Sequence, residues 1–252
     1  MGPNIMRILY FTCSAGFEHS VVKRDGNQLS HSEKILTAIG KRDGFEVECT
    51  KDGRIFESDL GQYDAFAFYT TGDPISEAGK RRLLDAVAVG KGFVGFHAAT
   101  DTFHSKGPEP DPYIAMIGGE FVTHGAPQEA SLFAVSPFFY KNVGVPSEGL
   151  SFTDEWYAQK NFAKDLHVIL VQETKYMKGD AYRRPDYPQT WVRMHGQGRV
   201  FYTSLGHREE VWTDPLFQAL AQGGIAWVLR KFDFDIKPNI DTVTPGANVL
   251  KS

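Results

Sequence analysis

Cysteine is scarce in this sequence, with only Cys13 and Cys49 among 252 residues. Two cysteines cannot form the disulfide framework on which small secreted domains depend, so a hydrophobic core must hold the fold together. Cys13 follows the first apolar segment and Cys49 ends the second, so a bridge between neighbouring strands stays open. Two reduced thiols are the other interpretation, and because these are typical of cytosolic proteins we expect a cytoplasmic location.

Long apolar runs and blocks of one charge are also missing. No apolar segment approaches the roughly 18 residues that a membrane helix requires, and no charged start followed by an apolar stretch marks a signal peptide. The 27 Lys and Arg residues are balanced by 31 Asp and Glu residues without a basic patch. We therefore expect neither a membrane nor a nucleic acid as a partner. Whether Met1–Ile5 is leader sequence, with Met6 as the natural start, stays open.

Motifs that would identify a cofactor are absent as well. No Gly-x-Gly-x-x-Gly follows the first apolar segment, so the sequence does not predict a dinucleotide-binding turn. There is no Cys-x-x-Cys and no close His-x-x-x-His pair, so a zinc-type divalent metal would need ligands from distant segments. The sequence therefore does not identify a cofactor, and a zinc-type divalent metal stays open as one.

Apolar residues are present in an ordinary amount, 42%, which is enough to bury one sizeable core. Without a repeat, a low-complexity segment or a linker, residues 6–230 are expected to form one domain, followed by a tail at 231–252. The alternating Phe232 and Phe234 of the tail cover either their own core or a partner subunit, so a homo-oligomer stays open. We expect the tail to fray beyond Thr244.

Short apolar segments alternate with amphipathic helical patterns, which is typical of βαβ units. The first helix begins at Ser30, with Glu33 at capping-box spacing. Strands are expected at 7–12, 45–49, 64–69, 91–97, 129–135, 166–172, 189–194 and 198–203, and helices at 30–44, 76–90, 113–117 and from 215. Residues 137–150 are expected to be loop and 173–188 a polar flap. The alternation predicts a parallel sheet with helices on both faces.

The stretch 91–103 is central, because its apolar strand stops abruptly at His97 and Asp101. Ligands of open α/β sheets gather beyond the carboxyl ends of the strands. His207 follows another predicted strand, after Gly206, which permits a sharp turn or the close approach of a ligand. If both strands end on one rim, the two imidazoles can exchange protons or bind a metal. A buried histidine that only bonds a strand-end carbonyl is the structural alternative.

Five stretches, in the same order, resemble the trehalose-utilisation (ThuA-like) family, and the resemblance extends from about Arg7 to Arg230. They are Gly16–His19, Thr70–Asp73, Gly92–Thr102, Thr153–Tyr157 and Gly198–His207. The resemblance implies the fold of class I glutamine amidotransferases, a flavodoxin-like three-layer α/β/α sandwich with a mostly parallel central sheet. It also implies a role in carbohydrate catabolism, with a small-molecule sugar as the partner.

In class I glutamine amidotransferases, a cysteine lies on the turn after a central strand and a histidine follows a later strand. The resemblance places His97 of this chain at the position of the cysteine and His207 at the position of the histidine. An imidazole cannot form the thioester on which glutamine hydrolysis depends, so we do not expect a glutaminase despite the shared fold. We expect His97 to be the principal acid or base and His207 its partner. Asp154 or Glu155 supplies an orienting or second catalytic carboxylate, and only one of these adjacent side chains can enter the pocket.

Further residues are candidates for binding the sugar. They are His19, Thr71, Asp73, Asp101, His124, Trp156 and Tyr157. Trp156 and Tyr157 form a stacking wall or pack in the core, and Asp101 orients an imidazole or lies at a helix N-terminus. His19, His97 and His207 are the candidate ligands of a zinc-type metal, since histidines from several loops can meet one ion.

Functions of different classes stay open. The first is an enzyme that acts on a disaccharide or keto-sugar derivative by histidine acid/base chemistry, as an isomerase, hydrolase or lyase. The second is a non-catalytic sugar-binding or regulatory module, and a metal-dependent hydrolase is a third. An enzyme should lose turnover in His97→Ala while it still binds its ligand.

Overall fold

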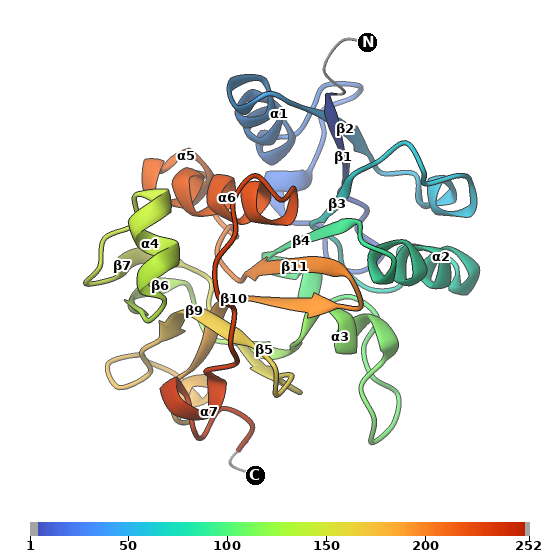
Figure 1. The fold of residues 1–252 in the computed structure, drawn as a ribbon. Coiled ribbons are helices and arrows are strands. Elements are labelled where there is room, and N and C mark those ends of the chain that lie inside the picture. Colours follow the sequence, from blue (N-terminus) through green and yellow to red (C-terminus); the bar gives the residue numbers. More distant parts are fainter. Residues whose placement is uncertain (1–4, 250–252) are drawn as a thin grey trace.

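A mixed β-sheet forms the middle layer of the molecule (Figure 1). The computed structural model describes residues 5–249, and within them nine strands join this sheet in the order β2-β1-β3-β4-β11-β10-β9-β6-β7. Their bounds are β1 Met6–Phe11, β2 Phe45–Thr50, β3 Ala65–Phe68, β4 Gly92–Phe96, β6 Gln128–Ala134, β7 Leu150–Asp154, β9 His167–Gln172, β10 Tyr187–His195 and β11 Gly198–Thr203. Two further strands, β5 Glu120–His124 and β8 Tyr157–Lys160, pair with each other. The question about Met1–Ile5 lies outside the described residues, apart from Ile5.

The sheet has a parallel half and an antiparallel half. Strands β2, β1, β3, β4 and β11 are parallel to one another, as the alternation of strands and helices predicted. From β11 onward each neighbour is antiparallel, beginning with the hairpin to β10. The predicted α/β fold is confirmed, and the antiparallel strands extend its sheet. Such strands need no crossover helix between them, so a βαβ pattern in the sequence does not reveal them.

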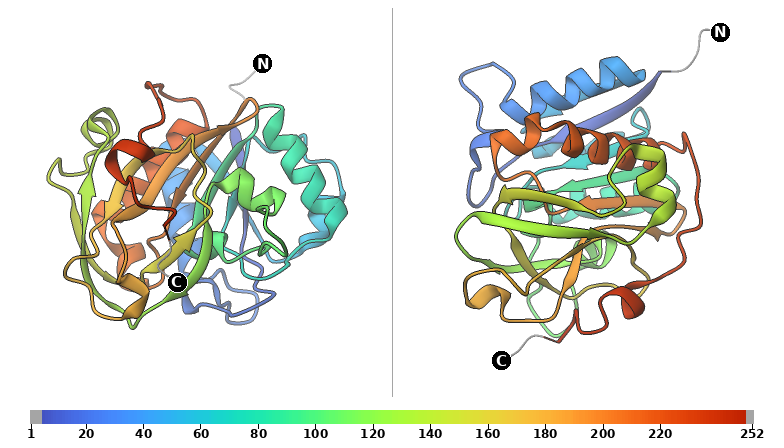
Figure 2. Two further views of the ribbon diagram at one scale, coloured as in Figure 1. Left: turned by 90° about the horizontal axis from the view of Figure 1, so that it is seen from below. Right: turned by 90° about the vertical axis from the view of Figure 1, so that its left-hand side faces the viewer.

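Helices cover both faces of the sheet and make three layers (Figures 1 and 2). One face carries α1 His31–Asp43, α4 Pro137–Val143, α5 Glu209–Thr213 and α6 Pro215–Val228. The other carries α2 Glu77–Ala88, α3 Pro112–Ile117, α7 Ile240–Val243 and the short 3-10 helix η2 Gly53–Glu57. A separate cluster of buried apolar side chains fills each interface between sheet and helices. In the described part of the chain, no helix has the length and hydropathy to cross a bilayer.

Helix α1 begins with the capping box that the sequence predicted. The Ser30 side chain accepts the Glu33 N–H at 3.4 Å, and the Glu33 carboxylate accepts the Ser30 N–H at 2.8 Å. The fully buried Glu33 also accepts bonds from Arg24 at 2.8 Å and from the Thr12 hydroxyl at 2.7 Å. Burial raises the pKa of Glu33, but these bonds outweigh it and hold the pKa below its usual 4.5. One carboxylate therefore ties α1 to the end of β1.

We expect Glu33→Gln to lower the free energy of unfolding by about 3 kcal/mol, because Arg24 loses the charge that faces it in a buried site. The folded pKa of Glu33 is depressed, so its stabilisation is complete above pH 4.5 and is lost as the pH falls through the folded pKa. Urea denaturation of both proteins from about pH 7 to about pH 3 should show their difference shrinking towards acid. A difference that stays constant with pH would contradict this account.

The structure corrects the prediction for residues 137–150, which were expected to be loop. They contain α4, which begins at Pro137 and is followed by Gly144 with a φ of 76°. Proline at the first helical position and glycine just after the last are signals of a helix, so the sequence contains local evidence for α4 that the loop prediction did not use. The predicted flap at 173–188 contains the single 3-10 turn η4 Asp180–Tyr182 and the start of β10.

The tail after Lys231 packs on its own chain. Phe234 is buried among other aromatic rings on the α6 face of the sheet. Asn248 both donates to and accepts from the backbone of Phe162. The expectation that the tail frays beyond Thr244 is therefore wrong up to residue 249. Its anchor is a polar side chain with a distant backbone partner, which hydropathy along the sequence does not reveal.

Candidate functional site

His97 directly follows β4 and adopts a left-handed backbone conformation, with a φ of 38°. This conformation is strained for a residue other than glycine, and such strain gathers at functional turns. Two bonds hold His97 in place: Tyr202 Oη donates to its carbonyl at 2.8 Å, and its Nδ1 donates to the Ser204 carbonyl at 2.7 Å. Because a carbonyl can only accept, Nδ1 carries a proton and Nε2 is left to face the site.

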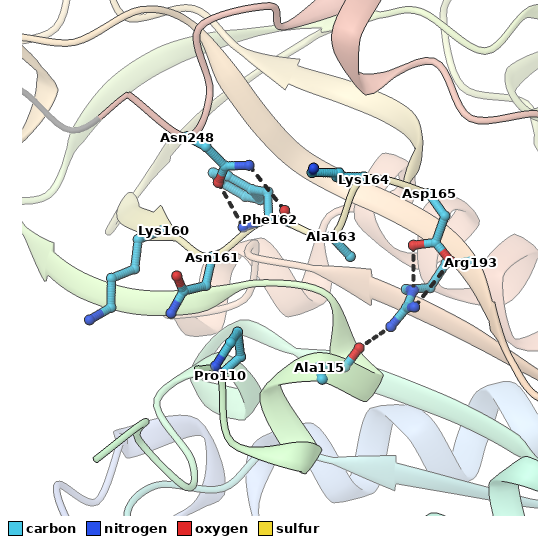
Figure 3. Close-up of a pocket in the computed structure, with 10 residues that line it drawn as sticks. All are labelled: Pro110, Ala115, Lys160, Asn161, Phe162, Ala163, Lys164, Asp165, Arg193 and Asn248. Atoms are coloured by element: carbon cyan, nitrogen blue, oxygen red, sulfur yellow. Dashed lines mark hydrogen bonds and ion pairs between the residues drawn. The ribbon is translucent and has the colours of Figure 1, made fainter. Parts of the chain in front are cut away.

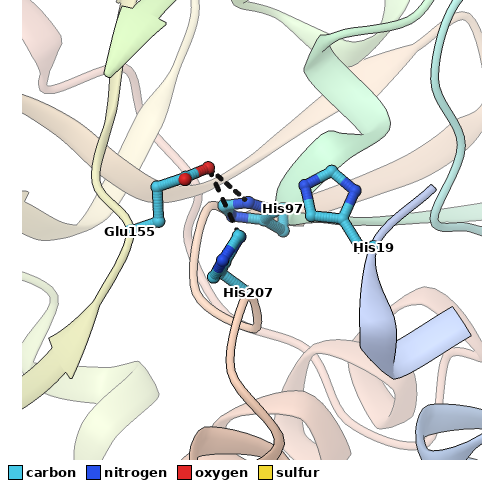
Figure 4. Close-up of side chains that lie close together, drawn as sticks. All are labelled: His19, His97, Glu155 and His207. Carbon is cyan, nitrogen blue, oxygen red and sulfur yellow. Dashed lines mark ion pairs between the residues drawn. The ribbon is translucent and has the colours of Figure 1, made fainter. Parts of the chain in front are cut away.

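Four side chains from four separate segments meet beyond the ends of the strands (Figure 4). His19 precedes the 3-10 helix η1 Ser20–Val22 after β1, His97 follows β4, and His207 follows β11. Glu155 comes from the connection between β7 and β8. The centroids of the three imidazole rings are 5.1, 5.2 and 5.3 Å apart. We call these four residues the His/Glu cluster, since one ligand atom of each lies within 4.8 Å of the other three.

Glu155 is the centre of the His/Glu cluster. Its Oε1 lies 3.3 Å from His207 Nδ1 and 3.6 Å from His97 Nε2. Its Oε2 lies 3.2 Å from Nδ1 of His124, the last residue of β5. Burial raises the pKa of Glu155, but the close contacts with His207 and His97 outweigh burial and hold the pKa well below its usual range. The carboxylate is therefore ionised at neutral pH and is shared by three imidazoles.

His19 is a neutral member of the cluster. Burial, reinforced by the neighbouring His97 and His207, lowers the pKa of His19 to about 2. Its Nε2 lies 3.5 Å from the Tyr157 hydroxyl. A neutral imidazole keeps one lone pair that can accept a proton, bind a hydroxyl or ligate a metal.

Asp154 lies next to Glu155 in sequence but does not contact the cavity. Its carboxylate accepts the backbone N–H groups of Gly206 at 2.8 Å, His207 at 3.4 Å and Arg208 at 3.1 Å. Burial raises the pKa of Asp154, while the charge of His97 and these backbone bonds oppose the rise. Asp154 therefore holds the loop that carries His207, and of the two adjacent acidic residues only Glu155 lines the cavity.

The His/Glu cluster opens into a cavity of about 340 Å³, which we call the cluster cavity. Its lining residues are Phe17, His19, Asp101, Phe121, His124, Glu155, Tyr157 and His207. Phe17 and Phe121 were not predicted from the sequence, although each lies within three residues of a proposed histidine. The rings of Phe121 and Tyr157 have centroids 4.1 Å apart and form an aromatic wall.

The other predicted residues do not line the cluster cavity. His97 belongs to the His/Glu cluster but is fully buried. Thr71 donates to the carbonyl of Phe17 at 2.9 Å and so holds the loop that carries His19. Asp73 is exposed on the surface, outside the lining. The predicted sugar contact of Trp156 is wrong, because its ring is fully buried in the core and its indole donates to a β6 carbonyl at 2.8 Å.

A second pairing of acid and imidazole lies at the rim of the cluster cavity. Asp101 lines the cavity and accepts a bond from His104 Nε2 at 2.6 Å. This bond raises the pKa of His104, and a further contact of its Nδ1 with Glu120 at 3.4 Å adds to the rise. Asp101 can therefore contact a ligand in the cavity while His104 holds its carboxylate in position.

A larger cavity of about 560 Å³ lies between α3 and the connection from β8 to β9 (Figure 3). Its lining includes Arg193, which pairs with Asp165 at 3.0 Å, and Asn248 from the tail. Its lining holds no imidazole and no residue that the sequence analysis proposed. Perturbed titratable groups in contact with a concave surface are the better sign of chemistry. We therefore take the cluster cavity as the candidate site.

Comparisons with known proteins agree with the fold. A sequence profile described as trehalose utilisation matches residues 7–228. A ThuA-like protein from Parabacteroides merdae ATCC 43184 is 20% identical with a TM-score of 0.71, over 90% of this chain and 91% of that one. A ThuA-like protein from Bacteroides uniformis ATCC 8492 is 23% identical with a TM-score of 0.67, over 90% and 91%. A β-galactosidase from Rahnella sp. R3 is 14% identical with a TM-score of 0.56, over 88% of this chain and 31% of that one. No curated protein sequence matches the chain.

Proposed function

Because the chain belongs to the trehalose utilisation family, we propose that it is an enzyme of carbohydrate catabolism. Its substrate is a disaccharide or a keto-sugar derivative, and its reaction is a proton transfer at a sugar carbon or oxygen. The observation that carries this proposal is a single ionised carboxylate shared by three imidazoles at the wall of a cavity. Glutamine hydrolysis is not part of it, because the turn after β4 presents an imidazole in place of a thiol.

The acid and base in this proposal are His207 and His124. Both line the cluster cavity, with side chains 24% and 42% exposed, and both direct Nδ1 at Glu155. A carboxylate at Nδ1 orients an imidazole and leaves Nε2 for a ligand. Two such imidazoles can remove a proton from one position of a sugar and return it at another.

His97 acts in this proposal through Glu155. Its ring is fully buried and lies below the carboxylate, so it positions Glu155 and does not touch the substrate. This differs from the expectation that His97 is the principal acid or base. The expectation rested on the position of His97 after a central strand, which does not tell whether the side chain reaches solvent.

The size and walls of the cluster cavity suit a sugar. Ligand pockets for small molecules typically have volumes of about 300–1,000 Å³, and the cluster cavity, at about 340 Å³, lies in that range. Phe121 and Tyr157 present aromatic surface, on which the apolar face of a sugar ring packs, and Asp101 offers an acceptor for hydroxyl groups.

A turnover screen over disaccharides and their keto derivatives tests this function. We expect at least one of them to be converted by the purified protein, and His207→Ala to lose turnover while it still binds that sugar. Binding of a sugar without conversion of any would favour the non-catalytic module. Neither binding nor conversion across the screen would contradict the proposal.

We expect Phe121→Ala to raise KM for the sugar by about tenfold, because one buried ring contact contributes about 1.4 kcal/mol or more to binding. The value of kcat should change less than KM, because Phe121 carries no proton and meets the proposed base His124 only by ring stacking, with centroids 6.1 Å apart. Steady-state kinetics measure both values. Val122→Ala, on the neighbouring exposed residue of β5, is the matched control. A large fall in kcat without a rise in KM would give Phe121 another role.

We further propose a cytoplasmic location. Both cysteines are free thiols in the structure, as is typical of proteins in a reducing compartment. A cytoplasmic protein of Salmonella typhimurium LT2 has a similar fold, with a TM-score of 0.56. Cell fractionation of the source organism tests this directly.

A further inference from the structure

We propose that the His/Glu cluster binds one divalent transition-metal ion of the zinc class. The ligands are one ring nitrogen of each of His19, His97 and His207 together with a carboxylate oxygen of Glu155. This inference rests on the proposed function only in that the ion would face the same cavity. The binding of the ion itself depends only on the four residues of the cluster.

His97 directs an unpartnered ring nitrogen into the cluster. His97 Nδ1 donates to the Ser204 carbonyl, so Nε2 is the ring nitrogen that is left for a ligand. This nitrogen is fully buried and has no hydrogen-bond partner among the described residues. It lies 3.6 Å from Glu155 Oε1, which is beyond hydrogen-bond distance. A cation between the two atoms would be bound by both.

The other two imidazoles of the cluster also have a buried ring nitrogen that makes no hydrogen bond. His19 Nδ1 is one, and His207 Nδ1 is the other, because its contact with Glu155 Oε1 at 3.3 Å does not have hydrogen-bond geometry in the described part of the chain. Buried polar atoms of native proteins nearly always have a partner, and each exception calls for a water, an ion or a ligand. Three exceptions within one cluster point to a single shared partner.

The types of the four donor atoms and the distances between them are close to those of a zinc site. Imidazole nitrogen with one carboxylate oxygen is a ligand set that suits zinc and its neighbours, in contrast to the all-oxygen sets of calcium and magnesium. Bonds of about 2.0–2.2 Å to a central ion require donor atoms roughly 3–4.4 Å apart. The four donor atoms lie within 4.8 Å of one another, so small inward movements of side chains are enough.

Hydrogen bonds and contacts to neighbouring groups already position the proposed ligand residues. A ligating histidine usually donates its second ring N–H to a carbonyl or carboxylate, which fixes the ring. His97 does this with Ser204 at 2.7 Å. The backbone of His207 is held by the buried Asp154, and His19 Nε2 lies beside the Tyr157 hydroxyl.

An ion here would complement the proposed reaction. It would face the cluster cavity and could polarise a carbonyl or hydroxyl oxygen of the sugar. His124 touches Glu155 Oε2 from the cavity side and is not one of the four ligands, so it stays available as a base. With His207 held as a ligand of the ion, the proton transfer assigned above to two imidazoles would fall to His124.

Metal binding to the purified full-length protein tests the inference. The protein is stripped with a chelator and titrated with Zn²⁺ in a calorimeter, and with Co²⁺ while its visible absorption is recorded. We expect one ion per chain, and a Co²⁺ spectrum typical of nitrogen and oxygen ligands in low coordination. His97→Ala and His207→Ala should each weaken binding by about 100-fold or more. His195→Ala, at the end of β10 and outside the cluster, is the matched control and should bind as the parent does.

The outcomes separate this inference from the proposed function. Uptake of one ion that the two variants lose upholds the site, even if no sugar is converted, and that failure would count against the function alone. If the stripped protein takes up no Zn²⁺, or if both variants bind it as tightly as the parent, the inference is overturned, whether or not a sugar is converted. Should His97→Ala fail to fold by circular dichroism, His207→Ala and Glu155→Gln, whose side chains reach the cavity, decide the question.

Discussion

Replacing Glu155 with glutamine is expected to lower kcat for the sugar substrate by about 10³-fold, within the range for loss of a group that supports acid/base catalysis. Glutamine keeps the size of the side chain but loses the charge that orients His207 and His124. It also replaces an anionic ligand atom of the His/Glu cluster with a neutral amide. Binding of the sugar should persist, because the aromatic wall of the cavity is unchanged.

Steady-state kinetics and a direct binding assay, on the substrate found in the turnover screen, check this expectation. Glu129→Gln is the matched control, since Glu129 is an exposed glutamate on the neighbouring strand β6. It should behave as the parent protein does. Glu155→Gln retaining turnover within a few-fold of the parent would remove the carboxylate from the mechanism.

The second large effect is expected for Asp154→Ala, which should lower the free energy of unfolding by about 3 kcal/mol or more. The change leaves the buried N–H group of Gly206 and the half-buried N–H groups of His207 and Arg208 without their shared acceptor. The loop after β11 would then lose its position, and turnover should fall with stability even though Asp154 does not line the cavity.

Urea denaturation gives the change in stability, and kinetics well below the unfolding midpoint give the change in turnover. Thr153→Ala is the control, because Thr153 is the exposed neighbour of Asp154 on β7. Asp154→Asn keeps an acceptor oxygen and should have a smaller effect on both measurements. Equal stability of Asp154→Ala and the parent would show that the loop is held by other contacts.

The parallel half of the fold could be predicted because its signals are local. Each strand is a short apolar run, and each helix between strands has its own cap, such as Ser30 with Glu33 before α1. The rule that ligands gather at the carboxyl ends of parallel strands then directs attention to the turn at His97. The antiparallel half has strands with alternating exposure at its outer end, such as β6 and β7, and the pairing of this half depends on partners distant in sequence, as β6 with β9 shows.

The candidate site was predictable in its residue types and less so in its orientations. Asp154 and Glu155 are adjacent in an extended segment, so the sequence indicates that they point in opposite directions but not which one enters the cavity. Trp156 looks like a sugar-stacking residue until its indole is seen bonded inside the core. Phe17 and Phe121 belong to no motif that marks a site, and only the folded chain brings them to the same cavity.

The seam between the two halves of the sheet gives the site a mechanical property. The three cluster histidines extend from the ends of β1, β4 and β11, whereas Glu155 extends from the far half, beyond β7. A ligand that binds both the carboxylate and the imidazoles therefore also links one half of the sheet to the other. Binding of such a ligand should raise the melting temperature of the protein, so thermal denaturation in the presence of candidate compounds offers a rapid screen for the natural ligand.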